Sequence, residues 1–227
     1  MLSLGGWLRA TPEERWDAPF PADRFVALDT ETTGLDARRD LPVEVAAIPF
    51  ADGEPQHEQA YVSYVNPGRP IPPLARAVHG IDDALVESAP GPHHVLAPLC
   101  DRCPEGTVLV GFHIGFDLAV LNRVARRAGA PQLAAPALDV AALAGGLSPA
   151  WFGLDLAELA GHLQIPVSGR HTAQGDAVTA GRIFLRLIPA LHARGIRTLR
   201  DALAFQERGS RTMTRGTAYL DFPPGAP

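Results

Sequence analysis

Three runs of apolar residues follow one another in the first third of the chain, and each has the length of a β-strand. They cover residues 25–32 (FVALDTET), 43–50 (VEVAAIPF) and 58–66 (EQAYVSYVN). Between them lie Gly34 and Gly53, each with an aspartate close by, and these residue types favour turns. Three successive strands with short links predict an antiparallel meander.

Beyond residue 90 the apolar positions take helical spacing, interrupted by one more strand over 107–113 (TVLVGFH). Helices are predicted over 94–100, 115–129, 154–162, 173–192 and 196–207. The second of these ends in Gly129, a residue typical of helix C-termini. The proline-rich segment 66–90 is expected to run over the surface with short helices. Strands first, then helices alternating with strands, predict an α/β fold: a mixed sheet, with an antiparallel meander plus parallel strands, flanked by helices.

A chain of 227 residues has room for one domain with extensions. The pattern of strands and helices occupies residues 24–190, which we assign to the main domain. Residues 1–23 are interpreted as an N-terminal extension. Residues 191–227 are interpreted as a C-terminal helix followed by a flexible tail.

Composition narrows the class of protein. With 46% hydrophobic and 20% charged residues the chain can bury a full core, and no apolar run approaches the roughly 20 residues of a membrane-spanning helix. The N-terminus lacks a basic region followed by an apolar stretch, so no signal peptide is predicted. Cys100 and Cys103 form a lone CxxC, which predicts neither a disulfide framework nor a zinc site. We therefore expect a soluble, cytoplasmic protein with no membrane partner.

All 20 basic residues are arginines, and the formal net charge is −5. That charge argues against a general polyanion binder. It is compatible with an enzyme whose acidic pocket is neutralised by cations. A few local arginines are then enough to bind a short nucleic-acid strand, because arginine binds phosphate through a planar fork.

Two carboxylates stand directly after the first predicted strand, where they are costly to bury. Asp29 and Glu31 follow the apolar residues 25–28. Side chains two apart on a strand point to the same face, so these two stand side by side. Turn formation with the following threonines and glycine is one interpretation. A bound divalent metal is the other, since a cation would compensate the two buried charges.

Two more acids and a histidine lie at the starts of later helices. Asp117 follows the strand over 107–113, and Asp176 falls in the first turns of the helix over 173–192, five residues after His171. Taken one at a time, the acids also fit helix capping or a helix-dipole role, and the histidine fits a solvated loop. Together with Asp29 and Glu31 they supply hard oxygen ligands and one base, which favours a site for Mg²⁺ or Mn²⁺.

Several motifs carry a family resemblance. They are DTETTGL (29–35), LPVEVAAI (41–48), the proline-rich segment with His79-Gly80-Ile81, LVGFHIGFDLAVL (109–121) and HTAQGDAVTAGRIFLRL (171–187). In these motifs, and over residues 24–190, the chain resembles the DEDDh 3′–5′ exonucleases. This DnaQ-like family has a ribonuclease H-like fold and includes the proofreading subunits of DNA polymerase III. The five-residue step from His171 to Asp176 is typical of its histidine-bearing subgroup.

The resemblance implies an activity and a set of metal ligands. The expected enzyme hydrolyses terminal phosphodiesters of single-stranded or frayed DNA ends to nucleoside 5′-monophosphates. Two divalent ions, Mg²⁺ or Mn²⁺, are implied. Asp29, Glu31 and Asp176 would hold the first ion, and Asp29 and Asp117 the second. His171 would be the general base.

The resemblance also implies neighbours of the terminal nucleotide, namely Thr30, Thr32, Leu35 and Phe116. For Leu35 and Phe116, ordinary core packing is the alternative. The chain departs from the family at Phe112-His113, where relatives read His-Asn. This pair is not expected to ligate metal. We therefore expect the departure to affect how the substrate strand is positioned. Asp139 matches a recurrent family acid and is interpreted as structural, and Glu44 matches another.

Two other functions stay open at this point. One is an RNA-directed 3′–5′ exoribonuclease of the same fold, and the other is a noncatalytic module that binds nucleic-acid ends. The intact set of four acids and one histidine argues against the second. The expected partners are the 3′ end of a single-stranded nucleic acid and a DNA polymerase.

Overall fold

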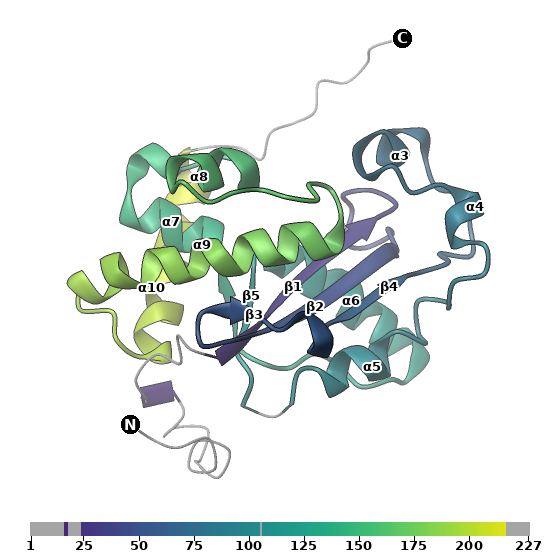
Figure 1. Cartoon of the computed structure of the whole chain (residues 1–227), viewed down its shortest axis with the longest axis horizontal. Helices are drawn as coiled ribbons and strands as arrows, with labels where there is room; N and C mark the ends of the chain where they lie inside the picture. Colours follow the sequence, from purple (N-terminus) through teal and green to yellow (C-terminus); the bar gives the residue numbers. More distant parts are fainter. Residues whose placement is uncertain (1–15, 18–23, 105, 217–227) are drawn as a thin grey trace.

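A six-stranded mixed sheet forms the centre of the protein (Figure 1). The computed structural model describes residues 16–17, 24–104 and 106–216. The strands are β1 (Arg24–Thr32), β2 (Pro42–Ala51), β3 (Glu54–Pro55), β4 (Tyr61–Tyr64), β5 (Leu109–Gly111) and β6 (Ala137–Asp139). Their order is β3-β2-β1-β5-β6, and β4 also pairs with β2. β2 runs antiparallel to β1, β3 and β4, whereas β5 is parallel to both β1 and β6. The predicted meander with added parallel strands is confirmed.

Helices cover both faces of this sheet. They are α3 (Pro73–His79), α4 (Asp83–Val86), α5 (Leu96–Asp101), α6 (Ile114–Ala128), α7 (Val140–Leu147), α8 (Leu156–His162), α9 (Ala173–Ala193) and α10 (Leu199–Gly216), with 3₁₀ turns at His57–Gln59 and Pro149–Trp151. Figure 1 shows α9 crossing one face of the sheet, while α5 and α6 lie on the other. Gly129 ends α6 in a left-handed conformation, as predicted.

The alternation of side chains along β1 divides the core into two layers. Phe25 and Ala27 pack in a cluster with residues of α7, α8 and α9. Val26 and Leu28 pack in a second cluster with residues of α5 and α6. Because the period of a strand is two, Asp29 and Glu31 continue the first face and Thr30 continues the second.

The structure differs from the sequence prediction at three elements, β6, α7 and α10. α7 and β6 were not predicted. α7 is apolar on all sides and therefore shows no amphipathic period that would indicate a helix. α10 runs to Gly216 instead of ending near residue 207, so its second half lies in the segment expected to be a flexible tail. No proline lies between Leu199 and Pro223, which is compatible with the longer helix. The remainder of the tail, 217–227, lies outside the described residues, as does nearly all of the extension over 1–23.

α10 packs against the free edge of the sheet. The side chain of Gln206 accepts a hydrogen bond from the backbone N–H of Asp139 (2.9 Å) and donates one to the carbonyl of Ala137 (2.9 Å). These bonds replace the strand partner that β6 lacks on that side, and they protect an otherwise open edge. Within the described ranges, no helix combines the length and apolar character needed to cross a membrane.

Candidate active site

The C-terminal half of β1 brings the first two acids to the face that α9 covers. Asp29 and Glu31 are partly buried there, and Glu31 pairs across the strands with Glu44 of β2. Thr30, between them, is buried and points to the opposite face. The alternation expected from the sequence therefore places the two carboxylates on one side of the sheet.

Asp117 reaches the site from α6. Parallel pairing of β1 and β5 brings their C-terminal ends to the same edge, and α6 begins at Ile114 directly after β5. The buried Asp117 accepts a hydrogen bond of 2.6 Å from the hydroxyl of Thr30. This contact was not predicted from the sequence. It fixes Asp117 against β1 and uses the hydrogen that the Thr30 hydroxyl can donate.

His171 and Asp176 approach from the start of α9. His171 has a left-handed backbone (φ 61°), and its N–H lies 3.3 Å from Oδ2 of Asp176. The potential ligand atoms of Glu31, His171 and Asp176 all lie within 4.8 Å of one another. The structure thus brings together three of the residues that the sequence placed in one site, from two segments about 140 residues apart.

Two local features hold the start of α9 in this position. Glu44 accepts a hydrogen bond of 2.8 Å from the backbone N–H of Ala173, in the first turn of the helix. A Cβ atom at Gly175 would lie 2.1 Å from the carbonyl oxygen of Gly169, so only glycine allows the loop to pass this close. The sequence marked Glu44 as a recurrent acid but did not indicate that it caps the helix bearing Asp176.

Burial and mutual repulsion alter the protonation of the acids. The pKa of Asp29 is well above its usual range, first because the carboxyl is desolvated and then because of the charges of Asp117, Glu31 and Asp176. Burial, helped by the charge of Asp176, raises the pKa of Glu31 to about 7. Burial also raises the pKa of Asp117 to about 7, although the Thr30 hydrogen bond opposes the shift.

The donor set fits divalent cations that prefer oxygen. Burial raises the pKa of Asp176 as well, and Arg170 opposes that shift. The second oxygen of Asp176, Oδ1, is buried and has no hydrogen-bond partner among the described residues. A buried carboxylate oxygen without a partner, beside carboxyls that repel one another, is well suited to a hard cation such as Mg²⁺ or Mn²⁺.

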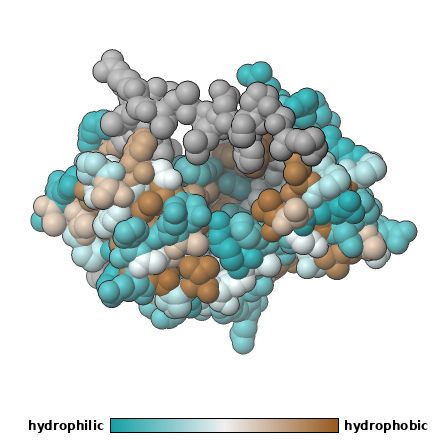
Figure 2. Space-filling model, turned by 90° about the horizontal axis from the view of Figure 1, so that it is seen from above, coloured by the Kyte–Doolittle hydropathy of each residue, from teal (hydrophilic) through white to brown (hydrophobic). Residues whose placement is uncertain are grey.

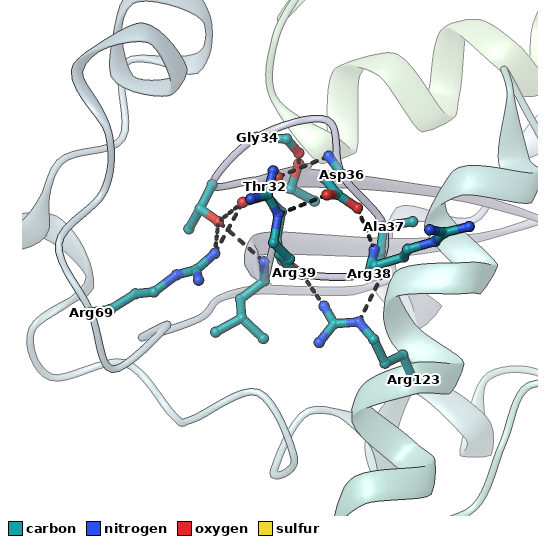
Figure 3. A network of polar contacts seen from close by, with 11 residues as sticks. Thr32, Gly34, Asp36, Ala37, Arg38, Arg39, Arg69 and Arg123 are labelled. Carbon is teal, nitrogen blue, oxygen red and sulfur yellow. Dashed lines mark hydrogen bonds and ion pairs between the residues drawn. The ribbon is translucent and has the colours of Figure 1, made fainter.

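The loop after β1 is fixed by a network of arginines with the aspartates Asp36 and Asp40 (Figure 3). Arg69 donates hydrogen bonds to the hydroxyl of Thr33 (2.6 Å) and to Asp40 (3.0 Å). The buried Arg123 of α6 donates to the carbonyls of Ala37 and Asp40. The loop that carries Leu35 is therefore held by Arg69, in the segment after β4, and by Arg123 of α6.

Of the predicted substrate neighbours, only Leu35 is freely accessible. Its side chain is 77% exposed, which contradicts core packing as its role. Phe116 is half-buried. Thr32 is buried, and its hydroxyl donates to the carbonyl of Gly34 (2.6 Å), so its side chain, like that of Thr30, bonds within the protein.

The departure at Phe112-His113 has a local explanation. Phe112 packs against the core, and His113 adopts the left-handed conformation (φ 55°) at the start of α6. Asp139 accepts the backbone N–H of His113 (3.0 Å) and also caps α7 through Ala141 (2.9 Å). The same carboxylate raises the pKa of the His113 imidazole. Asp139 thus makes the kind of contacts expected of a structural residue.

α3 lies beside the end of the sheet that carries the acids. His79, at the end of α3, has its pKa lowered by burial and by the charge of His171, and the backbone of Thr32 opposes this shift. α3 therefore lies next to the acidic residues, with Leu74 (84%) and Val78 (55%) exposed. Seen from the side of α3 and α8, the surface is hollowed near its centre, with apolar and polar residues around the hollow (Figure 2).

Comparison with known proteins decides the family. Residues 26–184 match the family model described as "Exonuclease". The chain belongs to this exonuclease family. The DnaQ-like resemblance, the ribonuclease H-like fold and the enzyme class predicted from the sequence are thereby confirmed.

Similar proteins include polymerase components. The chain is 39% identical over 201 residues to a "DNA polymerase III subunit epsilon-like protein" of Rhodobacter capsulatus. The aligned region covers 86% of this chain and 28% of that protein. It is 31% identical to a "DNA polymerase III PolC-type" of Lactococcus lactis, over 75% of this chain and 10% of that protein. The chain therefore spans about a quarter or less of these relatives.

Solved structures of similar fold include exonucleases. E. coli Exonuclease I in complex with a dT13 oligonucleotide superposes with a TM-score of 0.64 at 19% identity, over 76% of this chain and 42% of that one. Exonuclease X in complex with 5′ overhanging duplex DNA gives a TM-score of 0.60 at 23% identity, over 80% and 99%. At these identities the likeness concerns the fold.

Proposed function

We propose that this exonuclease-family chain removes nucleotides from the 3′ ends of single-stranded or frayed DNA in a reaction that depends on divalent metal. The observation that carries the proposal is the convergence of Glu31, His171 and Asp176 within 4.8 Å. Asp29 and Asp117, whose charges act on one another, complete the set. The four carboxylates lie in the C-terminal half of β1 and in the first turns of α6 and α9, where buried carboxylates are costly without a cation.

The ligands divide into two groups in this proposal. Asp29, Glu31 and Asp176 would hold one Mg²⁺ or Mn²⁺, and Asp29 and Asp117 a second. Bound there, the ions would stabilise charge on the attacking and leaving oxygens of a phosphodiester. The protein's own part is to keep the carboxylates fixed, which the Thr30 and Glu44 hydrogen bonds support.

His171 is the proposed general base. It takes a proton from the water that adds to the terminal phosphorus, while the bond to the 3′ oxygen of the preceding nucleotide breaks and a nucleoside 5′-monophosphate leaves. Neutral imidazole is the form that accepts the proton. The exposed Leu35 and the half-buried Phe116 would contact the terminal nucleotide, because apolar side chains contact base faces without reading sequence.

DNA is favoured as substrate by the relatives named as DNA polymerase III proteins and by the DNA-bound neighbours of the fold. The same relatives support a DNA polymerase as partner. We further propose a role in proofreading or repair and a cytoplasmic location. RNA remains the alternative substrate. RNA and DNA differ by the 2′-hydroxyl, so whether the site accepts that group would distinguish the two substrates.

The test is a side-by-side digestion of uniformly labelled single-stranded DNA, duplex DNA with a 3′ mismatch, and RNA, in Mg²⁺, in Mn²⁺ and in chelator. We expect 5′-mononucleotides from both DNA substrates only with metal, slower release from RNA, and inhibition by a 3′-phosphate. Circular single-stranded DNA is the control. Cleavage of the circle at the rate of the linear strand, or full activity in chelator, would contradict the proposal.

A further inference from the structure

Arg170 lies directly before His171 and reaches into the acidic site. Its Nη1 donates to Oδ2 of Asp176 at 2.5 Å and lies 3.3 Å from Nδ1 of His171. The arginine side chain is 30% exposed, whereas that of Asp176 is 7% exposed. The guanidinium therefore enters from the open side of the site and ends on a buried carboxylate.

The chemistry of the guanidinium defines what this contact does. It has only donors, so Nδ1 of His171 must be the acceptor in this contact. One cation thus occupies a lone pair of the proposed base and an oxygen of a proposed metal ligand at the same time. Its charge also lowers the pKa of Asp29, Glu31 and Asp176, against the effect of burial.

The loop does not need the Arg170 side chain to keep its shape. Thr172 donates to the carbonyl of Gly169 (2.7 Å) and accepts the N–H of Gly175 (3.0 Å). Glu44 holds the next residue, Ala173, from β2. These contacts fix both ends of the segment. The loop therefore does not depend on the contact of Arg170 with Asp176 for its conformation.

We propose that Arg170 is a displaceable counter-ion of the acidic site, which competes with divalent metal for Asp176 and with the substrate water for His171. The inference rests on the proposed metal-dependent function. In the metal-free protein the guanidinium holds the positive charge that the carboxylates require. When metal binds, Arg170 leaves Oδ2 of Asp176 and Nδ1 of His171, which frees the ligand and the base together.

If Arg170 competes with metal, its removal should change the metal-free stability and the metal affinity in opposite directions. A purely structural role for Arg170 does not predict this. Removing Arg170 should lower the thermal stability of the metal-free protein, because the carboxylates lose a counter-ion. It should raise metal affinity, because no cation has to be displaced. We expect a gain on the order of tenfold, within the usual range of coupling between two binding events.

The experiment is a calorimetric titration of the purified full chain with Mn²⁺ at pH 7.5 and low salt, paired with the metal-free melting temperature. The variants are Arg170→Ala, Arg170→Gln, which keeps a side chain of similar reach without the charge, and Arg170→Lys, which keeps the charge. Arg200→Ala is the matched control, since it removes an arginine from an ion pair with Asp17 away from the site. We expect tighter Mn²⁺ binding and a lower melting temperature in the Ala and Gln variants, with Lys and the control near the wild type.

Unchanged or weaker Mn²⁺ binding in both uncharged variants would overturn the inference while leaving the proposed function intact, provided that the wild type binds Mn²⁺ and Asp176→Asn does not. If the wild type takes up no Mn²⁺ saturably, the metal site and the inference fall together. Tighter binding without a lower metal-free melting temperature would also contradict a counter-ion role.

Discussion

Glu44 accepts a hydrogen bond of 2.8 Å from the backbone N–H of Ala173 and thereby joins β2 to the first turn of α9 across 129 residues. The carboxyl is buried, and burial raises its pKa against the effect of this hydrogen bond. Asp176 stands on the same helix one turn later, so this contact helps to hold a proposed metal ligand in place.

Glu44→Ala should therefore destabilise the protein by about 1–3 kcal/mol, the usual effect of leaving a buried group without its partner. Glu44→Gln should lose much less, because the amide oxygen still accepts the N–H and the repulsion with Asp176 is removed. Denaturant unfolding measures both, and Glu54→Ala on the exposed β3 is the control. Equal losses in Glu44→Ala and Glu44→Gln would show that charge, not the helix cap, is what matters.

The metal-free protein should become less stable as the pH rises. The pKa values of Glu31 and Asp117 are raised from 4.5 and 3.8 to about 7 in the folded protein. The folded state therefore keeps these protons to higher pH than the unfolded chain, so its stability is greatest at low pH and is lost as the pH rises through about 7.

Melting temperatures in chelator between about pH 5 and pH 8 test this sign. We expect a steady decline, reversed by Mg²⁺ at the upper end, and a flatter curve for Asp117→Asn. A melting temperature that rises over this range without metal would contradict the proposed repulsion among the acids.

Thr30→Val should show what the hydroxyl of Thr30 contributes to Asp117. The valine keeps the shape but removes the donor of the 2.6 Å hydrogen bond, which leaves a buried carboxyl oxygen without it. We expect a loss of about 1–3 kcal/mol in stability. We also expect weaker Mn²⁺ binding at neutral pH, because this hydrogen bond opposes the rise in the pKa of Asp117 that burial causes. Thr30→Ser retains the hydroxyl and should resemble the wild type in both measurements.

His171→Ala should separate a base from a ligand. If His171 accepts the proton, the variant should bind Mn²⁺ with nearly unchanged affinity and turn over about 10²–10⁴-fold more slowly. Because His171 stands within 4.8 Å of Glu31 and Asp176, a large loss of Mn²⁺ affinity is the informative opposite result, and it would make His171 a metal ligand.

Local patterns determined much of this protein. The period of two along residues 25–32 places Asp29 and Glu31 on one face and Thr30 on the other, and Gly129 ends α6, because strand alternation and helix caps depend on neighbours in the chain. The motifs around Asp29, Asp117 and His171 were enough to recognise the family, whose model matches residues 26–184.

Only the tertiary structure determined which residues of the site contact one another. Thr30 meets Asp117 from 87 residues away and Glu44 meets Ala173 from 129 residues away, distances over which no sequence period operates. The register of β1 against β2, and the packing of α6 and α9 on opposite faces, set these contacts. The same packing turns Arg170 inward onto Asp176, whereas its position in the sequence shows only an arginine beside a histidine.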